Sequence, residues 1–477
     1  MKYYIQTLGC AMNYSDSERV AALLEKLGYN RTTEPDETDL YIFNTCSIRQ
    51  KGEDKVFGQL HNLEDIKKRN PRLLVGITGC MVRTTSSRNS SKEIKDEIIK
   101  RVDSVDFVFK ITEAHKIGEV LAEAEPQLDL PQLEESELQD YLRIKPKYTS
   151  KFQAFVPIQI GCDKYCTYCI VPYSRGREKS RPMEDILKEC KALVEHGCKE
   201  ITLVGQTVNS YGLSMLDKKS GMFEGMKDPF VKLLTEIDRL KEIGLNRVRF
   251  TSPHPHDYTD ALIQAHVDLP TLCAHFHLPV QAGNDQILKR MNRKYTVEEF
   301  KNIVKKIRAK LPDASITTDI IVGFCGETAE QYEDSYKLFE ELRFDMVYIS
   351  RYSPRPGTVS YNAFKDDVSY EDKAIRWHKM NDLLEICSRE KNQSMEGKVV
   401  EVLVEKFNEK TGEAEGKSRE FKVIQFPGNQ NLVGAIVHVQ VTQGLEWFLK
   451  GELLERKSSL VEKRATQKTS SKVLTKI

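Results

Sequence analysis

The stretch 156–169 reads VPIQIGCDKYCTYC and decides how the central part of the chain is interpreted. An apolar, strand-like run ends at Ile160, and the loop after it carries Cys162, Cys166 and Cys169, named here the barrel cysteine set. Three thiolates on one loop can bind three irons of a 4Fe-4S cluster and leave the fourth iron open to another ligand. A closed zinc knuckle is the alternative, but such a site needs four protein ligands and this loop supplies three.

Five further strand-like runs follow this loop, with helical patterns between them. The six runs lie at 156–160, 201–204, 247–251, 275–279, 316–322 and 346–352. This alternation predicts a partial βα barrel with six strands. In such a barrel the loops at the carboxyl ends of the strands form the active-site face, so the cysteine loop is expected there.

The N-terminal part alternates in the same way, with strand-like runs at 3–8, 40–44 and 73–78. It predicts a three-layer domain with an open parallel sheet, whose first helix is expected to be capped by Ser15 or Asp16. The N-terminal cysteine set, which comprises Cys10, Cys46 and Cys80, follows these three strands. Because the carboxyl ends of parallel strands share one edge, the thiols are expected to converge and bind a second cluster. Buried cysteines that pack as small apolar side chains are the alternative.

Changes in composition divide the chain into further segments. An acidic stretch with two prolines predicts a connector, period-two alternation near the C-terminus predicts a small antiparallel β-barrel, and a tail with seven Lys or Arg and two Glu predicts basic disorder. In chain order we expect an N-terminal domain at 1–118, the connector at 119–147, the barrel domain at 148–388, the small β-barrel at 391–454 and the tail at 455–477.

Composition limits the classes of function. Lys and Arg number 72 against 71 Asp and Glu, so a polyanionic partner would need a local basic surface. Without an apolar run of about 18 residues or a leader-like start, the chain is expected to be soluble and cytoplasmic, with no membrane partner. Thiols stay reduced in that compartment, so the eleven cysteines are read as ligands or core residues. Five are expected in the core: Cys190, Cys198, Cys273, Cys325 and Cys387.

The barrel cysteine loop resembles the signature of the radical S-adenosylmethionine superfamily, with Tyr168 at the aromatic position before the last cysteine. Over 1–454 the chain resembles the methylthiotransferases of that superfamily. The resemblance is carried by TLGCAMN at 7–13, NTCSIR at 44–49, GCM at 79–81, LPVQAG at 278–283 and DIIVGFCGET at 319–328. In the last motif Cys325 replaces the usual proline.

The resemblance implies two 4Fe-4S clusters and S-adenosylmethionine as cofactors. The barrel cysteine set would hold the cluster that cleaves S-adenosylmethionine, and the N-terminal set an auxiliary cluster that supplies or carries sulfur. One S-adenosylmethionine would give the methyl group and another the radical, with a low-potential electron donor as partner. The candidates for the cofactor pocket are Tyr168, Gly205, Gln206, Asn209, Gln281 and Gly323.

The substrate is indicated by TSPHPH at 251–256 and FLKGEL at 448–453, which resemble the branch that acts on tRNA isopentenyladenosine. That branch adds a methylthio group at C2 of this base, next to the anticodon. Threonylcarbamoyl-adenosine in tRNA and an aspartate of a ribosomal protein are the alternatives within the family, and a non-catalytic iron–sulfur RNA-binding module is the alternative outside it. Candidate phosphate contacts are Lys398, Lys417, Arg419 and Lys422.

Overall fold

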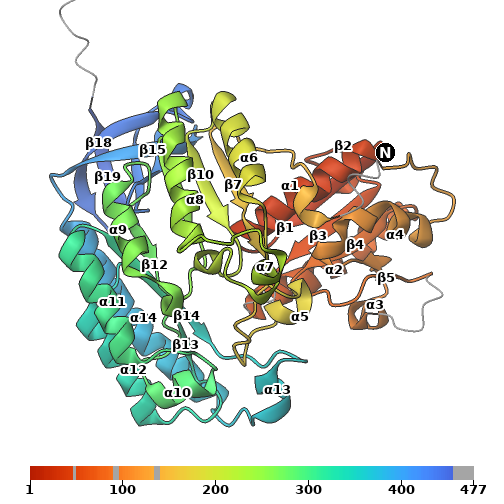
Figure 1. Ribbon diagram of the computed structural model, residues 1–477. Helices are drawn as coiled ribbons and strands as arrows, with labels where there is room; N and C mark the ends of the chain where they lie inside the picture. Colours follow the sequence, from red (N-terminus) through yellow and green to blue (C-terminus); the bar gives the residue numbers. More distant parts are fainter. Residues whose placement is uncertain (47–49, 90–95, 134–139, 455–477) are drawn as a thin grey trace, which may run out of the picture. The chain divides into compact units, whose positions relative to one another are not determined.

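The computed structural model describes residues 1–46, 50–89, 96–133 and 140–454, with backbone only at 50–53. The chain divides into two compact units, Met1–Cys387 and Ser388–Ile477 (Figure 1). Within the described residues, no helix combines the length and the apolar character that a membrane crossing requires.

The N-terminal part of the first unit is built on a six-stranded sheet in the order β2-β1-β3-β4-β6-β5 (Figure 1). Its strands are β1 (Lys2–Thr7), β2 (Asn30–Arg31), β3 (Leu40–Thr45), β4 (Leu74–Gly79), β5 (Ser86–Ser87) and β6 (Phe107–Val108). All neighbours are parallel except β5 and β6. Every residue of β3 and β4 is buried, as expected for parallel strands covered on both faces.

Helices cover both faces of this sheet. Leu23 and Leu121 belong to one buried cluster, whereas Leu60 and Ile99 belong to another. The first pair lies on α1 (Ala11–Lys26) and α4 (Ile117–Ala124), and the second on α2 (Gln50–Arg69) and α3 (Glu97–Arg101). The predicted three-layer domain with a parallel sheet is therefore confirmed.

Helix α1 begins after Cys10, which corrects the expectation of a cap at Ser15 or Asp16. The side-chain oxygen of Asn13 accepts a hydrogen bond from the backbone N–H of Cys10 (3.2 Å). Ser15 and Asp16 lie inside the helix and are fully buried. A short polar side chain before an apolar run suits a helix cap, but here both residues contact other segments of the unit instead.

The second part of the first unit is a partial barrel of six parallel strands, as predicted (Figure 1). One sheet contains β7 (Gln153–Pro157), β10 (Glu200–Val204) and β11 (Arg247–Phe250), and the other β12 (His275–His277), β13 (Ser315–Val322) and β14 (Met346–Arg351). A parallel bridge between Val248 and Leu272 links the two sheets. The main helices between the strands are α6 (Met183–Glu195), α8 (Pro229–Asp238), α9 (Asp260–Asp268), α11 (Val297–Lys310) and α12 (Ala329–Leu342).

The first barrel strand differs from the expected run at 156–160. Strand β7 ends at Pro157, and β8 (Gln159–Ile160) instead pairs antiparallel with β9 (Lys179–Ser180). After Pro157 the N–H of Ile158 still donates to the carbonyl of Val204 on β10 (3.0 Å), while its carbonyl already accepts from the N–H of Arg181, next to β9 (2.8 Å). The cysteine loop therefore runs from this hairpin to the short helix α5 (Val171–Arg175), so it does not leave the barrel strand directly.

Shorter elements complete the first unit, and the helix α14 (Tyr370–Gln393) continues from it into the second unit. The short helices are α7 (Met215–Ser220), α10 (Asp285–Arg290) and α13 (Val359–Ala363). The 3-10 turns are η1 (Pro35–Glu37), η2 (Ile111–Lys116), η3 (Tyr141–Arg143), η4 (Val208–Ser210), η5 (Arg239–Ile243) and η6 (Pro255–Asp257). In the segment predicted as a connector, Tyr141 and Leu142 are buried in the core that α1 and α4 share.

The second unit is a closed barrel in the order β15-β16-β17-β19-β18, as predicted. Its elements are β15 (Val399–Asn408), β16 (Glu413–Ser418), β17 (Val423–Pro427), η7 (Gln430–Leu432), β18 (Ile436–Gly444) and β19 (Leu449–Leu453). Only the β17–β19 pairing is parallel among these neighbours. Val402, Ile424 and Val439 point into its buried core. The predicted basic tail at 455–477 lies outside the described residues.

Candidate iron–sulfur and cofactor site

The three loops that carry the N-terminal cysteine set are joined at one edge of the sheet. The backbone N–H of Leu8 donates to the carbonyl of Asn44 (2.8 Å), and that of Cys80 donates to the carbonyl of Thr45 (2.9 Å). Gly79 allows the second approach, because a Cβ atom there would lie 2.2 Å from the carbonyl oxygen of Thr45. The parallel topology thus brings the three loops together, as the sequence predicts.

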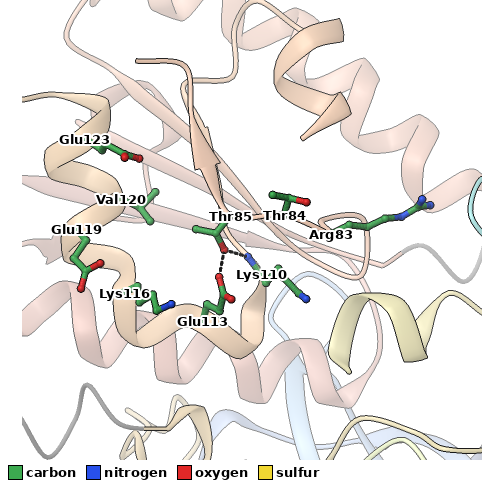
Figure 2. A pocket seen from close by; sticks show the side chains of 9 residues that line it. All are labelled: Arg83, Thr84, Thr85, Lys110, Glu113, Lys116, Glu119, Val120 and Glu123. Atoms are coloured by element: carbon green, nitrogen blue, oxygen red, sulfur yellow. Dashed lines mark hydrogen bonds between the residues drawn. The ribbon is translucent and has the colours of Figure 1, made fainter. Parts of the chain in front are cut away.

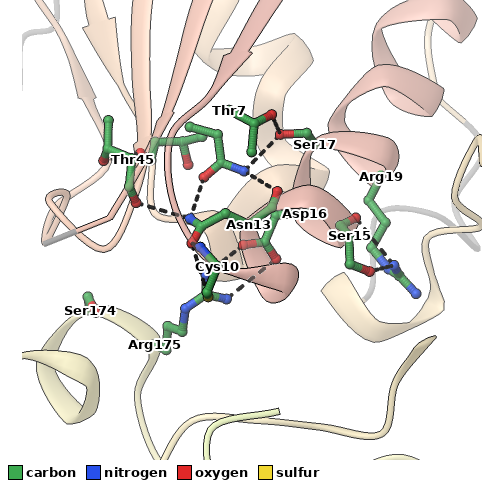
Figure 3. Close-up of polar contacts among 12 residues, drawn as sticks. Thr7, Cys10, Asn13, Ser15, Asp16, Ser17, Arg19, Thr45, Ser174 and Arg175 are labelled. Carbon is green, nitrogen blue, oxygen red and sulfur yellow. Dashed lines mark hydrogen bonds and ion pairs between the residues drawn. The ribbon is translucent and has the colours of Figure 1, made fainter. Parts of the chain in front are cut away.

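Asn13 fixes the Cys10 loop on this edge through buried amide hydrogen bonds (Figure 3). Its side-chain N–H groups donate to the Asn44 side chain (2.9 Å) and to the Thr45 carbonyl (3.0 Å). Asn44 in turn donates to the carbonyl of Asn13 (2.7 Å). The Asn13 side-chain oxygen lies 3.3 Å from the Cys10 sulfur. The position of the Cys10 side chain therefore depends on Asn13 and Asn44, which come together only when the sheet has folded.

The thiols of the N-terminal set lie within electrostatic range of one another. Burial raises the pKa of Cys10, a Cys80 thiolate raises it further, and the Arg175 guanidinium opposes the shift. Cys46 lies against the same turn, since a Cβ atom on Gly9 would be 3.0 Å from the Cys46 Cβ. Ser47, Ile48 and Arg49 of the same motif lie outside the described residues.

The barrel cysteine loop begins with a glycine that no other residue could replace easily. Gly161 has a φ of 79°, and a Cβ atom there would lie 2.1 Å from the carbonyl oxygen of Arg177. The next residue, Cys162, donates its N–H to the carbonyl of Gly176 (3.2 Å). The Cys162 sulfur lies 3.2 Å from the Thr207 hydroxyl, at the carboxyl end of β10. The loop is therefore anchored at the predicted active-site face.

Arg293 is a buried residue of the site that sequence patterns do not indicate. It donates a hydrogen bond to the Cys166 sulfur (3.3 Å) and another to the carbonyl of Pro279 (2.9 Å). Its third partner is the Tyr295 hydroxyl (2.9 Å). Arg293 and Cys166 are 127 residues apart, so no local spacing could have paired them.

The barrel cysteine set fits a cationic iron–sulfur group by the chemistry of its donors. Burial raises the pKa of Cys162 to about 11. Burial also raises the pKa of Cys169, and thiolates at Cys166 and Cys162 raise it further. Three neighbouring thiolates repel one another unless a cation compensates them, which an iron cluster would do. Among the described residues, no group of three or more His, Cys, Asp or Glu side chains is arranged to hold a single metal ion.

The two cysteine sets are linked by the Arg175–Asp16 ion pair (2.5 Å), which joins the helix after Cys169 to the helix after Cys10. A thiolate at Cys80, in the N-terminal set, contributes to the raised pKa of Cys169 in the barrel set after burial and the thiolates of its own set. Cys80 likewise contributes to the raised pKa of Arg175, whose first stabilising partner is Asp16.

The predicted pocket residues that follow β10 lie beside Cys162. Gly205 is required by close packing, because a Cβ atom there would lie 2.7 Å from the Gln159 side chain. Gln206 has a buried side-chain oxygen with no hydrogen-bond partner among the described residues. Asn209 exchanges two hydrogen bonds with the backbone of His254 (2.8 and 2.9 Å), and so holds this loop to the segment after β11.

The other predicted pocket residues have structural partners of their own. Gln281 has a φ of 71° and its backbone pairs with β13. Gly323 donates its N–H to the Glu327 carboxylate (2.6 Å), and a Cβ atom on it would lie 2.3 Å from the Lys373 side chain. The Tyr168 ring packs edge-on against Phe324, with 6.3 Å between ring centres. Their contact with a cofactor stays a prediction.

Several buried polar atoms near the barrel mouth lack a partner in the described part of the chain. They are the side-chain oxygens of Gln159 and Gln206 and the Nε2 of His254. The His254 Nδ1 accepts a hydrogen bond from the N–H of His256 (3.3 Å), so Nε2 carries the proton of the neutral ring. Burial lowers the pKa of His254, which keeps it neutral. Buried polar atoms are normally paired, so these three atoms fit a bound polar ligand.

A surface pocket of about 430 Å³ lies elsewhere in the N-terminal part (Figure 2). Three basic and three acidic side chains line it together with Thr84, Thr85 and Val120. The Thr85 hydroxyl joins its walls by donating to Glu113 and accepting from the N–H of Lys110. The pocket is lined by no cysteine and its charges balance, so it is not the cofactor site.

The predicted phosphate contacts of the second unit include two residues with acidic neighbours. The Lys417 ammonium lies 3.0 Å from the Glu405 carboxylate and over the Phe421 ring. Arg419 lies 3.9 Å from Glu401. The five remaining cysteines, by contrast, are all buried as expected: Cys190, Cys198, Cys273, Cys325 and Cys387.

Three family models match the chain in order: an uncharacterized protein family, UPF0004, at 2–109, the radical SAM superfamily at 156–339 and the TRAM domain at 393–454. Among solved structures, the radical S-adenosylmethionine methyltransferase TsrM from Kitasatospora setae, with cobalamin and a [4Fe-4S] cluster bound, is similar with a TM-score of 0.52. That match has 13% identity and covers 76% of this chain and 74% of that one, so it bears on the fold alone.

Curated relatives match nearly the whole chain. The tRNA-2-methylthio-N(6)-dimethylallyladenosine synthase of Geobacillus kaustophilus is 42% identical over 95% of this chain and 82% of its own length. The enzyme of that name from Dictyoglomus thermophilum is 42% identical, with 95% and 98% covered, and that from Bacillus subtilis is 40% identical, with 95% and 86% covered. With this identity along almost its full length, the chain belongs to the family of tRNA-2-methylthio-N(6)-dimethylallyladenosine synthases.

Proposed function

We propose that this chain adds a methylthio group to C2 of isopentenyladenosine next to the anticodon of tRNA. The observation that carries the proposal is the buried Arg175–Asp16 ion pair, which joins the helix after Cys169 to the helix after Cys10, in a chain about 40% identical to such synthases over 95% of its length. A radical centre alone would not need the N-terminal set. Two sets linked in this way suit a reaction that makes a radical and then delivers sulfur to it.

In this proposal the barrel cysteine set holds one 4Fe-4S cluster and the N-terminal set holds an auxiliary one. When bound, these clusters and two S-adenosylmethionine molecules supply the radical, the sulfur and the methyl group. Arg293 donates a hydrogen bond to the Cys166 sulfur and so orients this side chain for iron binding. The buried oxygen of Gln206 is available to accept a hydrogen bond from the cofactor, and the Nε2–H of His254 is available to donate one.

The second unit is proposed to hold the tRNA. A small β-barrel of the TRAM type with exposed basic side chains suits binding of RNA through its phosphates. Trp447 and Phe421 are exposed on the same unit and could stack on unpaired bases. We also propose a low-potential electron donor, a cytoplasmic location and the five-segment division given by the sequence.

Two cysteine variants test the proposal. Cys162→Ala, reconstituted with iron and sulfide, should lose both S-adenosylmethionine cleavage and methylthio-adenosine in tRNA. Cys10→Ala should keep cleavage and lose methylthiolation. Iron should fall from about eight per chain to about four in each variant, since each set would hold four irons. Nucleoside mass spectrometry and deoxyadenosine release measure these outcomes.

Cys190→Ala is the matched control, because Cys190 is buried in the barrel core and belongs to neither set. It should retain iron, cleavage and methylthiolation. Methylthio-adenosine made by Cys162→Ala would overturn the proposal. Methylthiolated threonylcarbamoyl-adenosine or ribosomal aspartate would move the activity to another branch of the family, and zinc without deoxyadenosine release would indicate a non-catalytic module.

A further inference from the structure

A buried ion pair joins the two parts of the first unit close to both cysteine sets. The Arg175 guanidinium lies 2.5 Å from the Asp16 carboxylate, and the two side chains are 2% and 0% exposed. Asp16 lies on α1, six residues after Cys10, and Arg175 ends α5, six residues after Cys169. The pair thus connects the helix that follows a cysteine of one set with the helix that follows a cysteine of the other.

Both members of this pair are held by further contacts. The Tyr141 hydroxyl donates to the Asp16 carboxylate. A second guanidinium nitrogen of Arg175 lies 3.4 Å from the other carboxylate oxygen of Asp16, so the guanidinium contacts both oxygens. Figure 3 shows the Arg175 side chain directed at Asp16, in the second turn of α1. Its position is therefore set by the fold and does not depend on a flexible surface contact.

The guanidinium also acts on the thiols of the N-terminal set. Figure 3 shows the Arg175 side chain next to Cys10, and the two groups interact electrostatically. A guanidinium is always charged in proteins. Arg175 belongs to the barrel part of the unit, so the barrel places a permanent positive charge next to cysteines of the N-terminal part.

Stability alone gives a weak reason for such a pair. Replacing a buried ion pair with apolar residues is often neutral or stabilising, because desolvation offsets the Coulomb attraction. Fe-S clusters, however, respond to nearby charge, since reduction adds negative charge that a neighbouring cation stabilises. A cation at this place would raise the reduction potential of a cluster held by the N-terminal set, and a carboxylate would lower it.

We propose that Arg175, oriented by Asp16, is a positioning residue that sets the reduction potential of the iron–sulfur cluster held by Cys10, Cys46 and Cys80. The inference rests on the proposed function, which assigns a cluster to that set. The reduction potential of the auxiliary cluster therefore depends on correct packing of the barrel part against the N-terminal part. The charge reaches the cluster only when the ion pair with α1 has formed.

The test uses full-length chain in which Cys162, Cys166 and Cys169 are all alanine, so that only the N-terminal set can bind iron. After anaerobic reconstitution, the midpoint potential is measured by redox titration monitored with electron paramagnetic resonance. Arg175→Gln, which leaves the Asp16 carboxylate alone, should shift the potential downward. Asp16→Asn, which leaves the guanidinium alone, should shift it upward. Arg175→Lys keeps the charge and should stay near the parent.

Opposite shifts distinguish a charge effect from damage to the interface, which would move both variants in the same direction. Arg249→Gln is the matched control, because Arg249 is likewise buried in an ion pair, with Glu200 (3.0 Å), at the amino end of β10. It should leave the potential unchanged. Unchanged potentials in Arg175→Gln and Asp16→Asn, or shifts of the same sign, overturn the inference. If Arg175→Gln does not fold, the upward shift in Asp16→Asn decides alone.

The parent protein separates this inference from the proposed function. About four irons per chain in the triple-alanine parent support the auxiliary cluster, whatever the effect of the Arg175 substitution on its potential. A parent without iron overturns the auxiliary cluster and the inference with it. If the parent holds four irons and neither Arg175→Gln nor Asp16→Asn changes its reduction potential, the inference is overturned and the proposed function is unaffected.

Discussion

Glycines at positive φ shape the barrel cysteine loop, and two of them differ in one informative respect. Gly161 and Gly176 have φ values of 79° and 77°. A Cβ atom on Gly161 would lie 2.1 Å from a backbone carbonyl oxygen, whereas one on Gly176 would meet nothing within 4 Å. The two positions therefore separate the cost of an unusual backbone conformation from the cost of a steric clash.

Gly161→Ala should remove the barrel cluster, and Gly176→Ala should not. Both variants have an alanine at positive φ, which costs on the order of 1 to 3 kcal/mol. Only Gly161→Ala must also displace the Arg177 carbonyl and with it the start of the cysteine loop. Iron content after reconstitution measures the difference: about four irons per chain for Gly161→Ala and about eight for Gly176→Ala. Equal iron contents would contradict this account of the loop.

At the scale of elements, the packing of α9 on the barrel depends on a buried histidine. The centre of the His266 ring lies 4.1 Å from the centre of the ring of Phe276, which belongs to β12. Its Nδ1 lies 3.0 Å from the carbonyl oxygen of Cys273. Because a carbonyl oxygen can only accept a hydrogen bond, Nδ1 carries the proton. Nε2 then accepts from the Tyr258 hydroxyl (3.2 Å). Both ring nitrogens are used by the neutral form.

Acid should therefore weaken this packing. Burial lowers the pKa of His266 to about 3, whereas an unfolded histidine titrates near 6.5. The unfolded state binds the proton first as the pH falls, so the contribution is complete above about 6.5 and declines as the pH falls toward 3. Between pH 7 and pH 5 the loss should be about 2 kcal/mol.

His266→Gln removes the titrating group and is the variant that checks this dependence. Urea unfolding of the barrel at pH 7 and pH 5 should show a smaller loss of stability in His266→Gln than in the parent. His196→Gln is the control, because His196 is exposed at the end of α6. A parent and a His266→Gln variant with the same pH dependence would show that His266 does not contribute.

At the scale of the whole molecule, the two compact units have separate cores. A chain ended after Cys387 keeps both cysteine sets and the barrel mouth, while it loses the small β-barrel. We expect it to retain S-adenosylmethionine cleavage and to bind tRNA at least about tenfold more weakly, with a shallower dependence on salt because fewer phosphates are contacted. Filter binding at several salt concentrations, with deoxyadenosine release as the control for the barrel, measures both. Unchanged tRNA affinity would remove the RNA-binding role of the second unit.

Much of the fold was predictable because its signals are local in sequence. Alternating apolar runs and helical patterns predicted the parallel sheet, the six-stranded barrel and the small β-barrel. The first barrel strand was misplaced because two strands with different partners, β7 and β8, share one apolar run. Ser15 and Asp16 were misread as caps because short polar side chains also serve buried contacts.

The sequence by itself determined the chemistry: two cysteine sets, their places after strands, and a family shared over almost the whole length. The tertiary structure alone decided what surrounds the thiols. Arg293 reaches Cys166 and Arg175 reaches Asp16 across 127 and 159 residues. Such pairs leave no periodic trace in sequence, because a buried charge takes whichever partner packing brings within hydrogen-bond distance.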